Sequence, residues 1–230
     1  DMAMGLGRMF GIEVAQNFDS PFKSASVKEF WRRWHITLGR FFTRYVYIPL
    51  GGSRKGKGRT ILNTLVVFAL SGLWHGAAWT FVFWGILHGA AVAFDSLGIL
   101  RLPKKWMHQA LTFVYVCLAF VFFRAATIEE GFGVLKAMAG LKWNGFLFQM
   151  AEALAPSEFY VVTKAASLAA PGLLPWIYLA LLLLLACVCV IVLAGKNAPA
   201  IAGEGVLSKK TAVWTAVLFA WSVLGMTGVS

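Results

Sequence analysis

Residues 61–94 read ILNTLVVFALSGLWHGAAWTFVFWGILHGAAVAF, an apolar run without a single Asp, Glu, Lys or Arg. An α-helix rises about 1.5 Å per residue, so one helix over this run would be roughly 51 Å long. About 20 apolar residues are enough to cross a bilayer. Ser71, Gly72 and Gly76 offer a break in the middle, which predicts two short or re-entrant segments that meet near His75. Irregular backbone at membrane depth persists only where protein surrounds it or where it lines a cavity, so this break is a candidate site.

Three more apolar runs follow, and we expect transmembrane helices over 106–123, 173–194 and 211–228. The whole chain is 59% hydrophobic and 13% charged, whereas soluble domains are about 25% charged. This composition excludes a disordered chain, a disulfide scaffold and most water-soluble enzymes. The sequence therefore predicts an all-α polytopic membrane protein, with residues 1–230 as one membrane domain and 1–60 as its interfacial, basic cytoplasmic segment.

The positive charge is concentrated in one part of the chain. Of the net charge of +11, residues 20–60 supply +9, from ten Lys and Arg and one acidic residue. A basic block beside apolar runs is typical of a cytoplasmic flank that contacts the lipid bilayer, and we expect no nucleic-acid partner. The positive-inside rule then places 51–60, 95–105 and 195–210 in the cytoplasm and 124–170 outside, which requires 61–94 to enter and return.

Two amphipathic stretches lie outside the apolar runs. Val27–Leu50 is rich in Trp, Tyr and Arg, which suits an interfacial helix. Residues 125–170 mix Glu and Lys with apolar side chains and are expected to form amphipathic helix on or near the membrane surface.

Two histidines are candidates for chemistry. His75 lies in the middle of the uncharged run, where an ionisable group is a functional candidate by default. Burial favours the neutral imidazole, which can accept a proton. The alternative is a structural histidine that is hydrogen-bonded between helices. His35 lies in the basic block, where it is either a second functional group or an amphipathic side chain at the level of the lipid headgroups.

The remaining pattern limits the chemistry. No carboxylate accompanies His75 in its run, so a local Ser-His-Asp triad is not predicted. Neither candidate histidine has Cys or carboxylate partners at ligand spacing, and we expect no metal site. His88 follows Trp84 by four residues on a possible helix face, which favours packing or a supporting role. His108 borders an apolar run and is expected to be interfacial.

Several ordered motifs resemble the membrane-bound O-acyltransferase (MBOAT) family. The matching segments are FWRRWHITL (30–38), YVYIPLGG (45–52) and LWHGA (73–77), together with DMAMGLG (1–7), NFDSPF (17–22) and FFRA (122–125). They look most like the bacterial branch that contains the alginate O-acetyltransferase membrane subunit and the D-alanyl transfer protein of teichoic acids. From residue 126 onward only the pattern of spans agrees. The resemblance implies that the chain is the C-terminal part of a longer protein.

The resemblance also implies a site and a reaction. His75 corresponds to the catalytic histidine and His35 to its partner on the cytoplasmic side of a tunnel. Trp74 and Trp79 are expected to wall this tunnel, with aromatic packing as the alternative. Arg32 and Arg33 are expected to attract an anionic donor, although lipid phosphates explain them equally well.

The expected function is acetyl transfer in the bacterial inner membrane, from a cytoplasmic thioester to the hydroxyls of an alginate-like exported polysaccharide. The donor is acetyl-CoA or another acyl thioester, and no tightly bound cofactor is expected. A periplasmic acetyltransferase is an alternative partner, to which a structural subunit would hand the acyl group. The competing class is a transporter or channel in which His75 relays protons.

Overall fold

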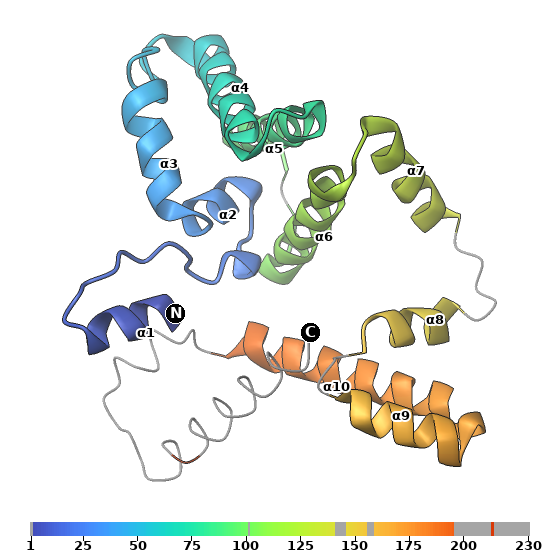
Figure 1. Cartoon of the computed structure of the whole chain (residues 1–230). Coiled ribbons are helices and arrows are strands. Elements are labelled where there is room, and N and C mark those ends of the chain that lie inside the picture. The colour runs from blue at the N-terminus through green and yellow to red at the C-terminus, as the bar shows by residue number, and fades with distance from the viewer. Residues whose placement is uncertain (1, 101, 141–145, 156–158, 196–212, 214–230) are drawn as a thin grey trace. The chain divides into compact units, whose positions relative to one another are not determined.

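The structure is a computed structural model that describes residues 2–100, 102–140, 146–155, 159–195 and 213. Every regular element in these ranges is a helix, which confirms the expected all-α fold (Figure 1). The chain divides into two compact units, residues 1–140 and 141–230, and each is described by itself. Whether both belong to one membrane domain stays a prediction.

The first unit contains nine helical elements in its described residues. They are α1 (Met2–Met9), η1 (Pro21–Lys23), α2 (Val27–Arg33), α3 (Ile36–Phe42), η2 (Thr43–Tyr47), α4 (Gly56–His75), α5 (Trp79–Leu97), α6 (Lys105–Arg124) and α7 (Ile128–Ala139). The single interfacial helix expected over Val27–Leu50 is wrong, because α2 ends at Arg33 and α3 begins only at Ile36. His35 separates them in the left-handed backbone region, with φ 50°, which no α-helix can pass through.

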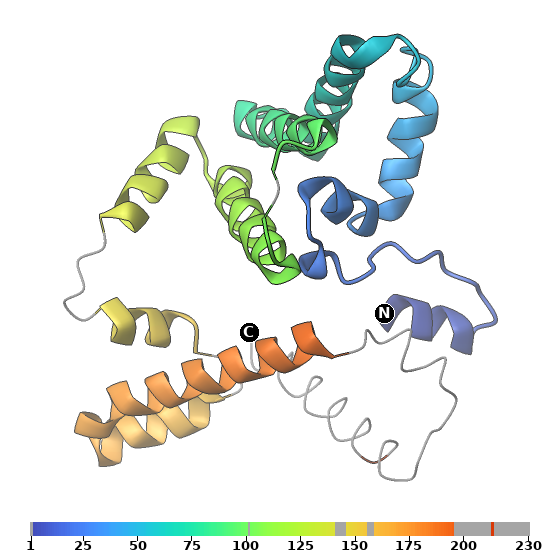
Figure 2. The ribbon, with the colours of Figure 1, turned by 180° about the vertical axis from the view of Figure 1, so that it is seen from behind.

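The uncharged run 61–94 forms α4 and α5, and its helical break falls at residues 76–78. Ser71 and Gly72 do not break the chain: both are buried inside α4. A Cβ atom on Gly72 would overlap the backbone carbonyl of Phe81, and one on Gly85 would overlap that of Phe68. Gly72 and Gly85 therefore allow the backbones of α4 and α5 to approach closely, as small residues do at helix interfaces in membranes. Figure 2 shows α4 and α5 against each other from behind.

Three helices among the described residues are long and apolar enough to cross a membrane: Trp79–Leu97, Lys105–Arg124 and Pro171–Ile191. The protein is thus a membrane protein. The runs 106–123 and 173–194 fall largely on the last two of these helices. Whether residues 61–94 enter the membrane and return to the same side stays a prediction. The expected span over 211–228 lies outside the described residues, which include only residue 213 there.

The second unit consists, where described, of α8 (Phe146–Ala153), α9 (Tyr160–Ala169), η4 (Pro171–Leu173) and α10 (Leu174–Ala194). The helix α10 packs against α8 and α9. In the described part of the stretch 125–170, α7 of the first unit and α8 and α9 of the second are three short helices.

The core of the first unit lies between α5 and α6. Trp84 on α5 is buried against Ala119 and Phe122 on α6. The Tyr115 hydroxyl on α6 donates a hydrogen bond to the Leu87 carbonyl on α5 at 2.7 Å. Because Trp84 also contacts the last residue of α4, this core positions the helical break.

Candidate functional site

His35 is held at the junction of α2 and α3. Local hydrogen bonds start α2, because the Ser26 hydroxyl accepts from the Glu29 amide and the Glu29 carboxylate accepts from the Ala25 amide. This reciprocal pair is a capping box shifted by one residue. At the other end of α2, the chain turns through the left-handed His35. Such backbone strain in a residue with a side chain is concentrated at functional sites.

Asn17 contacts this junction from a distant part of the chain. Its backbone carbonyl accepts the Ile36 amide at 2.9 Å. Its side-chain oxygen Oδ1 accepts the Thr37 amide at 3.0 Å and the Thr37 hydroxyl at 2.9 Å. Its Nδ2 lies 3.4 Å from Nδ1 of His35. Asn17 therefore supplies the N-terminal cap of α3 in place of a residue from the helix itself.

His75 is the last residue of α4 and lies in an aromatic environment. Its ring meets Trp84 edge-to-face at 5.4 Å and Phe123 at 5.2 Å between ring centroids. The Phe81 ring is 6.4 Å away. The side chain is half-buried in this chain. The imidazole is thus oriented by packing against α5 and α6.

Trp74 connects the two candidate histidines. Its indole contacts His75 at 5.0 Å and His35 at 5.9 Å between ring centroids, edge-to-face in both cases. Residues 40 positions apart in the sequence therefore meet at one site, and Trp74 is 58% exposed there.

A cavity of about 740 Å³ opens beside His35. Its walls come from α2, α3, η2, α4 and α5, and they include Trp31, Phe68 and Ser71. The charged lining residues among those described are all basic: Lys28, Arg32, Arg40 and Arg44. We call this volume the basic cavity. Apolar walls with cationic groups suit a ligand that has an anionic part and an apolar part.

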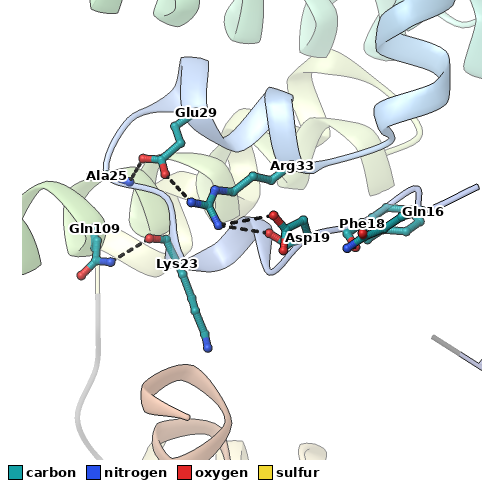
Figure 3. A network of polar contacts seen from close by, with 8 residues as sticks. All are labelled: Gln16, Phe18, Asp19, Lys23, Ala25, Glu29, Arg33 and Gln109. Atoms are coloured by element: carbon teal, nitrogen blue, oxygen red, sulfur yellow. Dashed lines mark hydrogen bonds and ion pairs between the residues drawn. The ribbon is translucent and has the colours of Figure 1, made fainter. Parts of the chain in front are cut away.

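The other predicted substrate-binding residues lie elsewhere. Arg33 does not line the basic cavity: its guanidinium pairs with Glu29 at 2.8 Å and with Asp19 at 3.8 Å (Figure 3). Trp79 is 79% exposed and lines a second pocket with Ala77, Ala78 and residues 126–129. Of the four, only Arg32 lines the basic cavity and only Trp74 contacts the histidines. The roles of all four stay predictions.

His88 is buried among aromatic rings. The rings of Trp31 and Trp84 lie 5.2 and 5.0 Å from it, and neither ring nitrogen has a hydrogen-bond partner among the described residues. The i,i+4 spacing of Trp84 and His88 is the sequence signal for this contact. Asn17 is the first residue of the NFDSPF motif, but nothing in that motif indicates its contact with His35, which spans 18 positions.

Comparison with known proteins identifies the family. The family model for membrane-bound O-acyltransferases matches residues 2–135. A peptidoglycan O-acetyltransferase of Helicobacter pylori is 45% identical over 155 residues, which cover 61% of this chain and 28% of that protein. A Pseudomonas aeruginosa protein named "Probable alginate O-acetylase AlgI" is 40% identical over 144 residues, which cover 60% of this chain and 27% of that protein. A teichoic acid D-alanyltransferase of Bacillus subtilis is 34% identical over 83 residues, which cover 33% of this chain and 21% of that protein.

The chain belongs to the membrane-bound O-acyltransferase family, because the family model covers more than half of it. This confirms the resemblance of the ordered motifs. The chain spans less than a third of the length of these relatives. The matched part contains both histidines, Trp74 and the basic cavity.

Proposed function

We propose that this chain carries the histidine site of an O-acyltransferase in a bacterial cytoplasmic membrane. The reaction moves an acyl group, here acetyl, from a cytoplasmic thioester to a hydroxyl of an exported polysaccharide. The relatives named as peptidoglycan and alginate O-acetylating proteins support both the acyl group and the class of acceptor. We propose no particular polysaccharide as the acceptor, because these two relatives are named for different polymers and are similar to this chain to a similar degree.

One observation carries the proposal: His35 borders the basic cavity, and Trp74 joins it to His75. An acyl thioester of the coenzyme A type has phosphates at one end and the reacting carbonyl at the other. Lys28, Arg32, Arg40 and Arg44 would attract the phosphates, so that the thioester end reaches the histidines.

In the proposed reaction, the neutral imidazole of His75 removes the proton from the acceptor hydroxyl. A hydroxyl is a weak nucleophile, and a positioned base contributes about 10²–10⁴ in rate. The hydroxyl oxygen attacks the thioester carbonyl carbon, and the carbon–sulfur bond breaks as the tetrahedral intermediate collapses. The protonated His75 then returns the proton to the leaving thiolate, so the site ends as it began.

The test is His75→Ala in the complete protein, reconstituted in vesicles with radiolabelled acetyl thioester and acceptor polymer. We expect transfer to fall by about 10²-fold or more at equal protein abundance, because the general base is lost. Transfer at the wild-type rate would contradict the assignment. His108→Ala, which changes a histidine at the N-terminal end of α6, is the matched control and should keep wild-type transfer.

The same vesicles separate the alternatives. A transporter or channel that relays protons through His75 would show solute flux without transfer of label to polymer. A subunit that hands acyl groups to a periplasmic acetyltransferase would transfer label to polymer only when that partner is added. Label on the polymer without a partner supports direct acyl transfer.

A further inference from the structure

We propose that Asn17 is a positioning residue that fixes the tautomer of His35, so that His35 presents an N–H donor at Nε2 and does not act as the base. This inference rests on the proposed acyl transfer, because it divides the roles of the two histidines in that reaction. Asn17 does not contact the reacting atoms in the proposed reaction, and it lies 18 positions before His35 in the sequence.

The orientation of the Asn17 amide follows from Thr37. Oδ1 accepts both the Thr37 amide and the Thr37 hydroxyl, at 3.0 and 2.9 Å. A flipped amide would place its NH₂ group against the Thr37 N–H, and two donors would face each other. The backbone carbonyl of Asn17 also accepts the Ile36 amide, which holds the residue in register with α3. The NH₂ group is therefore the part of Asn17 that faces His35.

The NH₂ group determines which nitrogen of His35 carries the proton. Nδ2 of Asn17 lies 3.4 Å from Nδ1 of His35, and an amide nitrogen donates but does not accept. Nδ1 must then present its lone pair, and the proton of a neutral imidazole lies on Nε2. Asn17 thus disfavours the other tautomer of the neutral ring.

The consequence is a division of labour in the site. With the proton of its neutral ring on Nε2, His35 serves as a donor. His75 has aromatic neighbours, and in the proposal its lone pair accepts the proton of the hydroxyl. During attack, Nε2–H of His35 donates to the thioester oxygen as negative charge develops on it, and keeps its proton throughout. The proton cycle between hydroxyl, His75 and thiolate is unchanged.

The decisive variant is Asn17→Asp in the complete protein in vesicles. Asp is as good an N-cap as Asn, so its carboxylate keeps the contacts to Thr37 and the fold. A carboxylate accepts but does not donate, so in the neutral ring it draws the proton of His35 to Nδ1 and leaves a lone pair at Nε2. We expect kcat to fall by about 10²-fold, the usual effect of losing one donor to an oxyanion, with little change in KM for the thioester. Wild-type kcat in this variant would overturn the proposal.

A matched control adds the same charge at another cap. Ser26→Asp introduces a carboxylate at the N-cap of α2, which has no contact with the His35 ring, and should leave kcat unchanged. Equal losses in both variants would show a general effect of charge and would overturn the proposal.

A second measurement does not depend on acyl transfer. The ring ¹⁵N resonances of His35, assigned by their loss in His35→Asn, report which nitrogen is protonated. We expect Nε2–H in the wild type and Nδ1–H in Asn17→Asp, and Nδ1–H in the wild type would overturn the inference. If the wild-type protein transferred no acyl group, the proposed function would fail while these spectra still decided the role of Asn17.

Discussion

The close contact between α4 and α5 leads to a sharp prediction for Gly85. An added Cβ atom at this position would overlap the backbone carbonyl of Phe68 and lie 3.3 Å from the amide nitrogen of Gly72. Both obstacles are backbone atoms of α4, which cannot rotate away as a side chain can. In Gly85→Ala the two helices must therefore separate or tilt.

The size of the effect follows from two opposing terms. Ala is better than Gly in a helix interior by about 0.8–1.0 kcal/mol. Overpacking costs about 1–3 kcal/mol, and occasionally more, and the rigid obstacle places this site near the upper end. We expect a net loss of about 1–2 kcal/mol in the free energy of unfolding. Gly133→Ala is the matched control: this helical glycine of α7 has no atom within 4 Å of an added Cβ, so it should gain up to about 1 kcal/mol.

The assay is thermal unfolding of the complete protein in nanodiscs, followed by circular dichroism and tryptophan fluorescence. Gly85→Ala should melt below the wild type and Gly133→Ala at or above it. Acyl transfer should also fall in Gly85→Ala below its melting temperature, because α4 ends in His75. Equal melting temperatures for the two variants would refute the reasoning, since they differ only in what the new methyl group meets.

Two further predictions concern side chains that hold the site in place. The buried Asn63 side chain donates to the carbonyls of Gly52 and Leu50, at 2.9 and 3.3 Å. Asn63→Ala leaves both carbonyls without this donor and should lower the free energy of unfolding by about 1–3 kcal/mol. Trypsin should then cleave the basic segment 54–59, which follows Gly52, faster than in the wild type. An unchanged cleavage rate would contradict this. Tyr115→Phe removes the hydrogen bond to the Leu87 carbonyl but keeps the ring, so it should lower the free energy of unfolding by about 0.5–1.5 kcal/mol; melting at the wild-type temperature would show that this bond is not needed between α5 and α6.

The sequence predicted the helical class and the break near His75 because both depend on local features. A run of 34 uncharged residues cannot be one span, and a glycine follows the histidine. The position of the break within the run was less predictable. Gly72 was a candidate breaker in the sequence, yet it lies inside α4, because its role depends on Phe81 of the next helix. A glycine that permits a turn and one that permits contact look the same in a sequence.

The candidate site could be predicted in part, because titratable side chains are unusual in apolar segments. His35 and His75 could be named because they are titratable groups in or beside apolar segments. The contact of the Trp74 indole with both histidines could be predicted only in part, and so could the lining of the basic cavity. Arg32 lines the cavity, whereas Arg33 pairs with Glu29 and Asp19. Adjacent arginines on a helix point about 100° apart, and only the packing of α2 determines which one faces the cavity. Asn17 begins the NFDSPF motif, but its role could not be predicted, because its partners lie 18 to 20 positions away.

The cap that Asn17 provides for α3 has a consequence for the order in which the site forms. The helix α2 begins with contacts between residues three and four positions apart, which can form as soon as the chain is made. The geometry of His35 needs the segment 17–35 to close into a loop first, and closing a loop costs entropy before any contact is gained. The junction is therefore expected to open before the helices melt. Acyl transfer would then be lost under mild denaturing conditions that leave the helical content intact.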